Sequence, residues 1–303
     1  MNTAGGSRYR RPVPDLPPDS GPEPLADDPR VVTFSHGGAT LVAEEAGAGR
    51  PVFLLVHGIG MGRKVFDGLV ELLARHGRVV AIDQPGYGSA PEPARTLTME
   101  RTADLVAAFV RASGLGPVVL IGHSMGTQVA TEVAVRHPTL VEQLVLVAPT
   151  VDRRARRLAP QLVRMARDLA VENPIVLYKG AREYLRAGPN LRGKLRAMLS
   201  HRPELAYPRI AAPTLVLRGA DDQVCPPEWC RSVVASIPGA QYSEVPGHRH
   251  ETMIRDPREA AERILRFVGQ FAAGSSTGTA AASAAQEASS RSRSADGDPG
   301  SAV

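Results

Sequence analysis

Short apolar segments alternate with helical patterns along most of the chain, and this alternation constrains the fold more than any other feature. Six segments each hold a compact apolar run that ends at Gly, Pro, Asp or His: PVFLLVHG, RVVAIDQPG, PVVLIGHS, QLVLVAPT, PTLVLRGADD and QYSEVPGH. Continuous apolar runs are typical of strands buried on both faces of a parallel sheet. Helical patterns lie between them, over about 64–76, 98–113, 125–137, 227–236 and 257–271. The sequence therefore predicts an α/β fold with a mostly parallel, doubly wound sheet and right-handed crossovers.

The flanking sequence predicts an edge hairpin and two tails. VVTFSH and ATLVAEEA precede the first of the six segments and are expected to pair antiparallel at one edge of the sheet. Residues 1–29 are rich in Pro, Asp and Gly, and residues 272–303 are rich in Ala, Ser, Gly and Thr. Neither stretch has enough apolar side chains to offset its ordering entropy, so both are expected to be disordered. The core is expected in two parts, 30–150 and 209–271.

The segment 151–208 interrupts the alternation and is expected to form a helical cap inserted after strand 6. It is helical in pattern, contains several prolines and lies between two predicted strands. Between Val151 and Ile210 there are 14 Lys and Arg against 5 Asp and Glu, so this part carries +9 in a chain of +5. Such a surface either is a set of solvated helix faces or attracts anionic partners.

A serine motif joins one predicted strand directly to a helix. In VVLIGHSMGTQVATEVAVRH, the apolar run leads into Gly122-His123-Ser124-Met125-Gly126. Glycines at both ends of the motif allow a turn too tight for a Cβ atom, which would hold Ser124 exposed in a strained backbone conformation. The following helix would direct its positive N-terminal end toward the serine oxygen. Ser124 is therefore the expected nucleophile, and a structural Gly-Ser turn is the alternative.

With a strand before it and a helix after it, this motif resembles the nucleophile elbow of the α/β-hydrolase family, and the resemblance extends over about residues 30–271. It implies the order nucleophile, acid, histidine along the chain, and an oxyanion hole fed by an earlier strand. It also implies a two-step acyl transfer through an acyl-enzyme.

The expected oxyanion loop follows an earlier strand. His57-Gly58-Ile59-Gly60 looks like the family's H-G-x-G, so the resemblance implies that the backbone N–H groups of Ile59 and Met125 face the oxyanion. Gly58 and Gly60 would let the backbone approach the substrate closely. His57 is expected to be a structural hydrogen-bonding residue and not a base.

The acid of the triad is expected in LVLRGADDQVCPPE. In the family, a strand is followed by G-x-x-D and by a proline about four residues later. Counting from Gly219 gives Asp222, and Pro226 follows at the expected distance. Asp221 is the alternative. The acid is expected to accept a hydrogen bond from the imidazole, which fixes its tautomer and stabilises the imidazolium.

The base is one of two histidines in PGHRHETMIRDP. The family places a proline at the start of the last helix at a fixed distance after the catalytic histidine. Pro257 is in register with His250 and comes two residues late for His248. His250 is therefore the expected base, and His248 is expected to be a loop residue at the pocket rim. A metal site at His-x-His would need a third protein ligand, and no adjacent motif supplies one, so no metal is expected.

The resemblance implies a carboxylesterase-like serine hydrolase acting on a small-molecule ester. The alternatives are hydrolysis of a C–C bond in a ring-cleavage product, a cofactor-free perhydrolase or haloperoxidase, and a non-catalytic ligand-binding protein. Many ring-cleavage-product hydrolases carry a small polar residue where this chain has Ile59, which disfavours C–C hydrolysis. Thioesters and lactones are within reach of the same chemistry, and the sequence leaves the substrate open.

The remaining expectations concern partners and location. No cofactor is expected, and the few aromatic residues argue against a nucleic-acid partner. No apolar run approaches the roughly 20 residues that a membrane helix needs. The first residues lack the apolar segment of a secretory signal. Two cysteines, Cys225 and Cys230, are too few for a disulfide framework and favour a reducing compartment, hence the cytoplasm. The oligomeric state is left open.

Overall fold

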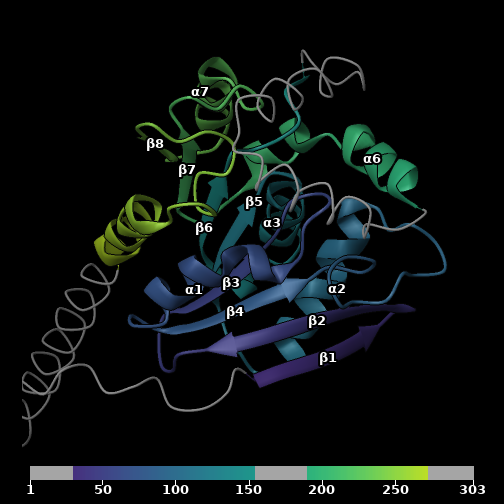
Figure 1. Cartoon of the computed structure of the whole chain (residues 1–303). Coiled ribbons are helices and arrows are strands. Elements are labelled where there is room, and N and C mark those ends of the chain that lie inside the picture. Colours follow the sequence, from purple (N-terminus) through teal and green to yellow (C-terminus); the bar gives the residue numbers. More distant parts are fainter. Residues whose placement is uncertain (1–29, 154–189, 272–303) are drawn as a thin grey trace, which may run out of the picture.

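A single twisted sheet organises the described part of the chain, which in this computed structural model comprises residues 30–153 and 190–271 (Figure 1). The sheet is eight-stranded, with the order β1-β2-β4-β3-β5-β6-β7-β8. β2 (Ala39–Ala46) runs antiparallel to both of its neighbours, β1 (Arg30–His36) and β4 (Arg78–Asp83), and all other pairs are parallel. The predicted edge hairpin and the mostly parallel sheet are confirmed.

The remaining strands coincide with the apolar segments of the sequence. They are β3 (Val52–Val56), β5 (Val118–His123), β6 (Val141–Val147), β7 (Thr214–Gly219) and β8 (Gln241–Val245).

The described helices are α1 (Asp67–Leu73), α2 (Met99–Ala112), α3 (Met125–Arg136), α6 (Leu191–Ser200), α7 (Pro227–Ser236) and residues 258–271. Short 3₁₀ turns are η1 (Arg63–Phe66), η2 (Pro138–Leu140), η4 (Pro203–Leu205) and η5 (Tyr207–Arg209). The helix expected over 64–76 thus begins as a 3₁₀ turn and ends earlier, at Leu73, because the chain must reverse before it enters β4.

Helices cover both faces of the sheet, which explains why its central strands are apolar and buried. Successive residues of a strand point to opposite faces. In β3, Leu54 and Val56 pack in a core cluster with residues of α2, α3 and α7. Phe53 and Leu55 pack in a second cluster with residues of α1 and of helix 258–271. β3 therefore contributes to two separate layers of the core.

The order of the strands creates a crevice for a ligand at one edge. From β3 the chain moves to β4 on one side, and β5 then pairs with β3 on its other side. In open α/β sheets, ligands bind outside the carboxyl ends of the strands at the point where the strand order reverses in this way. The loops after β3 and β5 meet at this point.

The predicted cap, 151–208, falls largely on residues outside those described, and so do both predicted tails. The chain resumes at residue 190 with α6, which leads through η4 and η5 into β7. Lys194 ties α6 to the loop after β4, because its buried Nζ donates hydrogen bonds to the Gly86 carbonyl (2.6 Å) and to the Glu92 carboxylate (2.8 Å).

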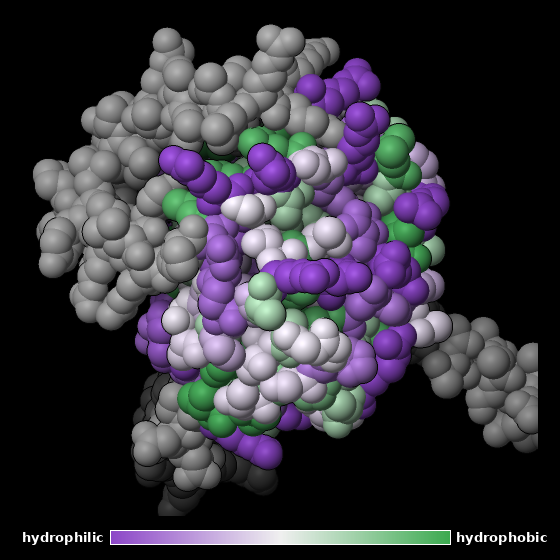
Figure 2. Space-filling model, turned by 90° about the vertical axis from the view of Figure 1, so that its right-hand side faces the viewer, coloured by the Kyte–Doolittle hydropathy of each residue, from purple (hydrophilic) through white to green (hydrophobic). Residues whose placement is uncertain are grey.

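The side of the molecule on the right in Figure 1 has a mixed surface. Figure 2 shows it facing the viewer, with hydrophilic residues (purple) interspersed among pale and hydrophobic ones. Within residues 30–153 and 190–271, no helix combines the length and the apolar character needed to cross a membrane.

Candidate active site

Ser124 occupies a strained turn between β5 and α3. Its backbone has φ 53° and ψ −121°, and Ala148 is the only other described non-glycine residue with a positive φ. A conformation of this kind costs about 1–3 kcal/mol and persists only where the surroundings enforce it. The two flanking glycines allow it. A Cβ atom on Gly126 would lie 2.1 Å from the Val56 carbonyl oxygen, and one on Gly122 would lie 2.5 Å from the Gly126 carbonyl oxygen.

Ser124, His250 and Asp222 form a continuous chain of hydrogen bonds. Ser124 Oγ lies 3.0 Å from His250 Nε2, although the two residues are 126 positions apart. His250 Nδ1 lies 2.9 Å from Asp222 Oδ2. If Nδ1–H donates to the carboxylate, the Nε2 lone pair is free to accept the serine proton. The three residues follow the carboxyl ends of β5, β7 and β8, which is where a parallel sheet gathers polar loops.

Asp222 is held as a carboxylate deep in the fold. Its side chain is buried, and Oδ1 accepts hydrogen bonds of 2.8 Å from the backbone N–H groups of Val224 and Cys225. Burial alone raises the pKa of Asp222, but the charge of His250 and these hydrogen bonds hold the pKa below its usual value. The alternative acid, Asp221, is exposed. Its backbone N–H donates a hydrogen bond to the His248 carbonyl at 2.9 Å.

The two histidines of the PGHRH segment have different partners. His248 lies against its own loop, with Nδ1 3.0 Å from the Pro246 carbonyl oxygen and Nε2 3.1 Å from that of Asp256. His250 alone of the two reaches Ser124 in the described structure. The His-x-His spacing therefore directs the two rings to separate surroundings, as expected for residues with different roles.

His57 is a buried, neutral ring. Its Nε2 accepts a hydrogen bond from the backbone N–H of Gln84 at 3.1 Å, and its Nδ1 lies 2.7 Å from the Gly58 carbonyl oxygen. Burial is the main cause that lowers the pKa of His57 to about 4. These contacts join the loop after β3 to the loop after β4 and fit the expected structural role.

The two expected oxyanion donors lie beside the serine. Met125 is the first residue of α3, so its N–H has no acceptor within the helix. A Cβ atom on Gly58 would lie 3.0 Å from the Cβ of Ser124, so the backbone that leads into Ile59 passes next to the nucleophile. Gly60 then turns the chain away with φ 71°. The geometry is compatible with N–H groups from Ile59 and Met125 around one oxygen.

A small pocket opens next to the elbow. Its walls include the side chain of Met125, Gln84 and Tyr87 from the loop after β4, Leu97 before α2, and Lys194 from α6. Tyr87 lies under the Lys194 ammonium, which is 4.3 Å from the ring centroid, and its hydroxyl contacts Met125 Sδ at 3.7 Å. The walls therefore combine apolar side chains with one buried cation.

Two supporting residues were not anticipated from the sequence. His123 is buried, and its Nε2 lies 2.8 Å from the backbone oxygen of His250. Burial, followed by the charge of His250, lowers the pKa of His123 to about 3, so its ring is neutral. The motif G-x-S-x-G leaves the residue before the serine unspecified. It identifies no hydrogen-bond partner for that residue, because the partner lies in a loop much later in the chain.

The second supporting residue is Arg218, which is buried at the end of β7. Its guanidinium donates hydrogen bonds to the Asp222 carbonyl (2.8 Å), the Cys225 carbonyl (3.0 Å) and the Glu244 carboxylate (2.6 Å). These bonds brace both ends of the short segment that carries the acid. A single arginine inside the apolar run TLVLRG is the signal that could have identified it, because a buried arginine needs several acceptors.

Cys225 and Cys230 are free and buried. Their Sγ atoms lie 3.1 Å apart, and Cys225 Sγ also donates to the Pro149 carbonyl at 3.1 Å. Burial raises the pKa of Cys225. Because the thiolate is the reactive form, this cysteine is a poor nucleophile and acts as a packing residue.

Comparison with known proteins agrees with this geometry. Residues 53–263 match the model of the alpha/beta hydrolase family. The chain is 29% identical to the 2-hydroxy-6-oxo-6-(2'-aminophenyl)hexa-2,4-dienoic acid hydrolase of Metapseudomonas resinovorans, over 78% of this chain and 90% of the relative. A thermophilic esterase structure from Thermogutta terrifontis has 26% identity and a TM-score of 0.67, and the match covers 80% of this chain and 99% of that one.

A structure of the enol-lactonase from Burkholderia xenovorans superposes with a TM-score of 0.68 at 20% identity, over 78% of this chain and all (100%) of that chain, which is a likeness of fold. The matched range includes the loop after β3, Ser124, Asp222 and His250. The chain belongs to the alpha/beta hydrolase family.

Proposed function

We propose that this protein is a serine hydrolase that cleaves a small-molecule ester through an acyl-enzyme on Ser124. The observation that carries the proposal is the hydrogen-bonded chain from Ser124 Oγ to His250 Nε2 (3.0 Å) and from His250 Nδ1 to Asp222 Oδ2 (2.9 Å). This is the order of contacts that general-base activation of a serine requires.

Each residue has one part in the proposed reaction. His250 Nε2 accepts the hydroxyl proton as Ser124 Oγ forms a bond to the carbonyl carbon, and the Asp222 carboxylate stabilises the resulting imidazolium. The N–H groups of Ile59 and Met125 stabilise the negative oxygen of the tetrahedral intermediate. The imidazolium then protonates the leaving alkoxide as the C–O bond breaks. A water molecule attacks the acyl-enzyme by the same route and releases the acid and Ser124.

A pocket beside Met125, the residue that follows the serine, supports a small substrate. The pocket is small. Its walls include residues of the loop that follows β4, together with Lys194 of α6. The similarity to the Thermogutta terrifontis esterase, at 26% identity, favours an ester over other carbonyl compounds. We further propose that segment 151–208 acts as the cap of this pocket and that the enzyme works in the cytoplasm without a cofactor.

Hydrolysis of a C–C bond is the second candidate. The similarity to the Metapseudomonas resinovorans hydrolase, at 29% identity over 78% of this chain, favours a dienoic acid substrate of that kind. Against it stands Ile59, a branched apolar side chain where many ring-cleavage-product hydrolases carry a small polar residue. The same triad would serve both reactions, so the substrate decides between them.

Two assays on the full chain distinguish these candidates. The first is a series of p-nitrophenyl esters with acyl chains from acetate to laurate, followed by release of p-nitrophenolate. The second follows the loss of visible absorbance of a 2-hydroxy-6-oxo-hexa-2,4-dienoate. Turnover of short esters with no bleaching of the dienoate supports the esterase proposal. A kcat/KM for the dienoate well above that for every ester would replace it with C–C hydrolysis. Absence of turnover in both would contradict both.

A further inference from the structure

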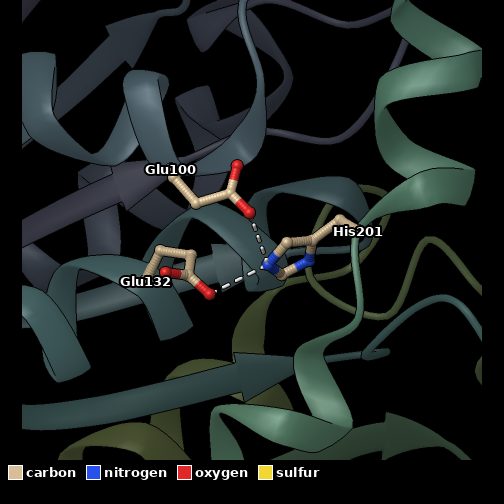
Figure 3. A group of neighbouring side chains, drawn as sticks. All are labelled: Glu100, Glu132 and His201. Atoms are coloured by element: carbon tan, nitrogen blue, oxygen red, sulfur yellow. Dashed lines mark hydrogen bonds and ion pairs between the residues drawn. The ribbon is translucent and has the colours of Figure 1, made fainter.

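A second group of polar side chains lies apart from the triad, where the chain returns from the cap region to the core. Glu100 is in the first turn of α2, Glu132 is in α3, and His201 directly follows α6. Figure 3 shows both carboxylates turned toward the same ring nitrogen of His201. Nε2 lies 2.9 Å from Glu132 Oε1 and 4.0 Å from Glu100 Oε1, and one atom from each residue falls within 4.8 Å of the others.

This group brings two carboxylates to a single imidazole ring. The side chain of Glu132 is 8% exposed, and a buried carboxylate needs a compensating charge or full hydrogen bonding. Within the described residues, no lysine or arginine forms an ion pair with Glu100 or Glu132. Arg136 lies one turn further along α3, but its guanidinium forms a two-point hydrogen bond with Asp104, at 3.1 and 2.8 Å. Glu100 is also hydrogen-bonded to the Thr98 side chain and to a backbone N–H at the start of α2. The His201 ring is the partner that the two carboxylates share.

Unsatisfied polar atoms within the group and beside it are a second observation. His201 Nδ1 is buried and has no hydrogen-bond partner among the described residues. The same is true of Gln128 Oε1. Gln128 precedes Glu132 by one helical turn and so shares its face of α3. Its amide nitrogen donates to the Met198 carbonyl of α6 at 3.0 Å. The interface between α3 and α6 therefore lacks hydrogen-bond partners that bound water would supply.

We propose that Glu100, Glu132 and His201 bind a divalent transition-metal ion, with Zn²⁺ preferred, and that water completes its coordination. An imidazole nitrogen with carboxylate oxygens is a typical zinc ligand set, whereas Mg²⁺ and Ca²⁺ favour oxygen ligands alone. Metal–ligand distances of about 2.0–2.2 Å place the ligands of a tetrahedral site about 3.4 Å apart. The observed separations of 2.9 and 4.0 Å lie on either side of this value, so small side-chain rotations suffice.

Binding requires a change of tautomer that limits the affinity. The ion takes the lone pair of His201 Nε2, so the ring proton moves to Nδ1. Metal-binding histidines usually donate that proton to a fixed acceptor, and loss of such a partner weakens metal binding by about 10–100-fold. No described residue accepts from Nδ1, so water must do so. We therefore expect binding about 10–100-fold weaker than that of a fully supported zinc site.

The site would be structural. Glu132 and Ser124 are eight residues apart in sequence, which is about 12 Å along a helix axis, so the ion does not reach the reacting atoms. It would instead join three elements, α2, α3 and the segment after α6. Because the ion binds the folded chain and not the unfolded one, it should raise the thermal stability of the protein.

The test is calorimetric titration of the chelator-treated full chain with zinc chloride, with cobalt chloride as an optical probe. We expect one Zn²⁺ per chain at this site and the visible bands of tetrahedral Co²⁺. His201→Gln and Glu132→Gln should each weaken binding by about 10-fold or more. Glu100→Gln removes a partly exposed ligand, so it should fold normally and still weaken binding; this variant keeps the test valid if the buried variants do not fold.

Matched controls separate this site from others. His137 has one carboxylate partner, with Nε2 2.9 Å from Asp104 Oδ1, and His137→Gln should bind zinc like the wild type. His250→Gln should also retain binding, which separates the ion from the triad. Failure of the wild type to bind zinc or cobalt would overturn the proposal. Equal affinity in wild type and Glu100→Gln, together with a loss in His137→Gln or His250→Gln, would overturn it as well.

Discussion

His123 lies 2.8 Å, at its Nε2 atom, from the backbone oxygen of His250, so the residue before the nucleophile holds the loop that carries the base. Because a carbonyl oxygen can only accept, His123 Nε2 must carry the proton. The ring centroids of the two histidines are 5.3 Å apart. The separation between Ser124 and His250 is therefore fixed from the serine side as well as through Asp222.

This contact predicts that His123→Ala impairs catalysis more than substrate binding. Without the N–H donor, the His250 backbone loses one restraint, and misplacement of a catalytic group by about 1 Å can cost about 100-fold in rate. We expect kcat for p-nitrophenyl acetate to fall by about 10–100-fold, with a smaller change in KM. His248→Ala, a change in the same loop, is the control and should retain most of the activity. A wild-type kcat in His123→Ala would show that the contact does not position the base.

Two buried neutral imidazoles predict how stability depends on pH. The pKa is lowered to about 4 for His57 and to about 3 for His123, in each case first by burial, from an unfolded value of 6.5. The unfolded chain therefore binds more protons between these values, so stability is fully present above about pH 6.5 and is lost as the pH falls toward 4. Each ring adds up to about 1.4 kcal/mol per pH unit to this loss.

Urea unfolding at several pH values between about 4.5 and 7 measures this slope. His123→Gln removes one of the two rings. The slope of unfolding free energy against pH should therefore fall by the contribution of one bound proton, about 1.4 kcal/mol per pH unit. The same slope in the variant and in the wild type would contradict the neutral, buried state of His123.

The neighbouring aspartates predict opposite outcomes for the same substitution. Asp222 is buried and holds His250 Nδ1, whereas Asp221 is exposed. Asp222→Asn should lower kcat by about 10⁴-fold, because the amide favours the wrong tautomer of the base. Asp221→Asn should stay close to the wild type, since its backbone N–H is unchanged. A loss in Asp221→Asn alone would assign the acid to Asp221. Comparable losses in both variants would contradict the distinction between the two aspartates.

The sequence predicted those features of the structure that depend on local residue patterns. Each apolar run that ended at Gly, Pro, Asp or His became a strand of the parallel sheet, since continuous apolar character is a local property. The family's spacing from Gly219 and from Pro257 singled out Asp222 and His250. In the structure His250 lies in hydrogen-bonding contact with Ser124, and Asp222 with His250.

Contacts between distant segments that no family motif records could not be anticipated. His123 meets a loop 127 residues later, and Glu132 meets a histidine 69 residues later. No pattern in either segment records its partner. The predicted cap and tails fall mostly on residues outside those described, so the division into domains stays a prediction.

Arg218 predicts a coupled loss of stability and activity. Arg218→Met keeps much of the volume but leaves the carbonyls of Asp222 and Cys225 without their donors. Each buried acceptor left unsatisfied costs about 1–3 kcal/mol, so the free energy of unfolding should fall by about 2 kcal/mol or more. Activity should also fall at temperatures where the variant is fully folded, because the acid loses its bracing. Arg266→Met, a change at an exposed position of helix 258–271, is the control. An active, fully stable Arg218→Met enzyme would contradict this role.

The measurement that tests the central claim most directly is the site of covalent labelling by a fluorophosphonate, read by mass spectrometry of a protein digest. The reagent reacts only with a serine that a base has activated. The account predicts one adduct, on the peptide that contains Ser124, which disappears in His250→Ala and persists in His248→Ala. Ser124→Ala should fold normally and lose ester hydrolysis by about 10⁴-fold or more. An adduct on another serine, or wild-type labelling in His250→Ala, would contradict the account.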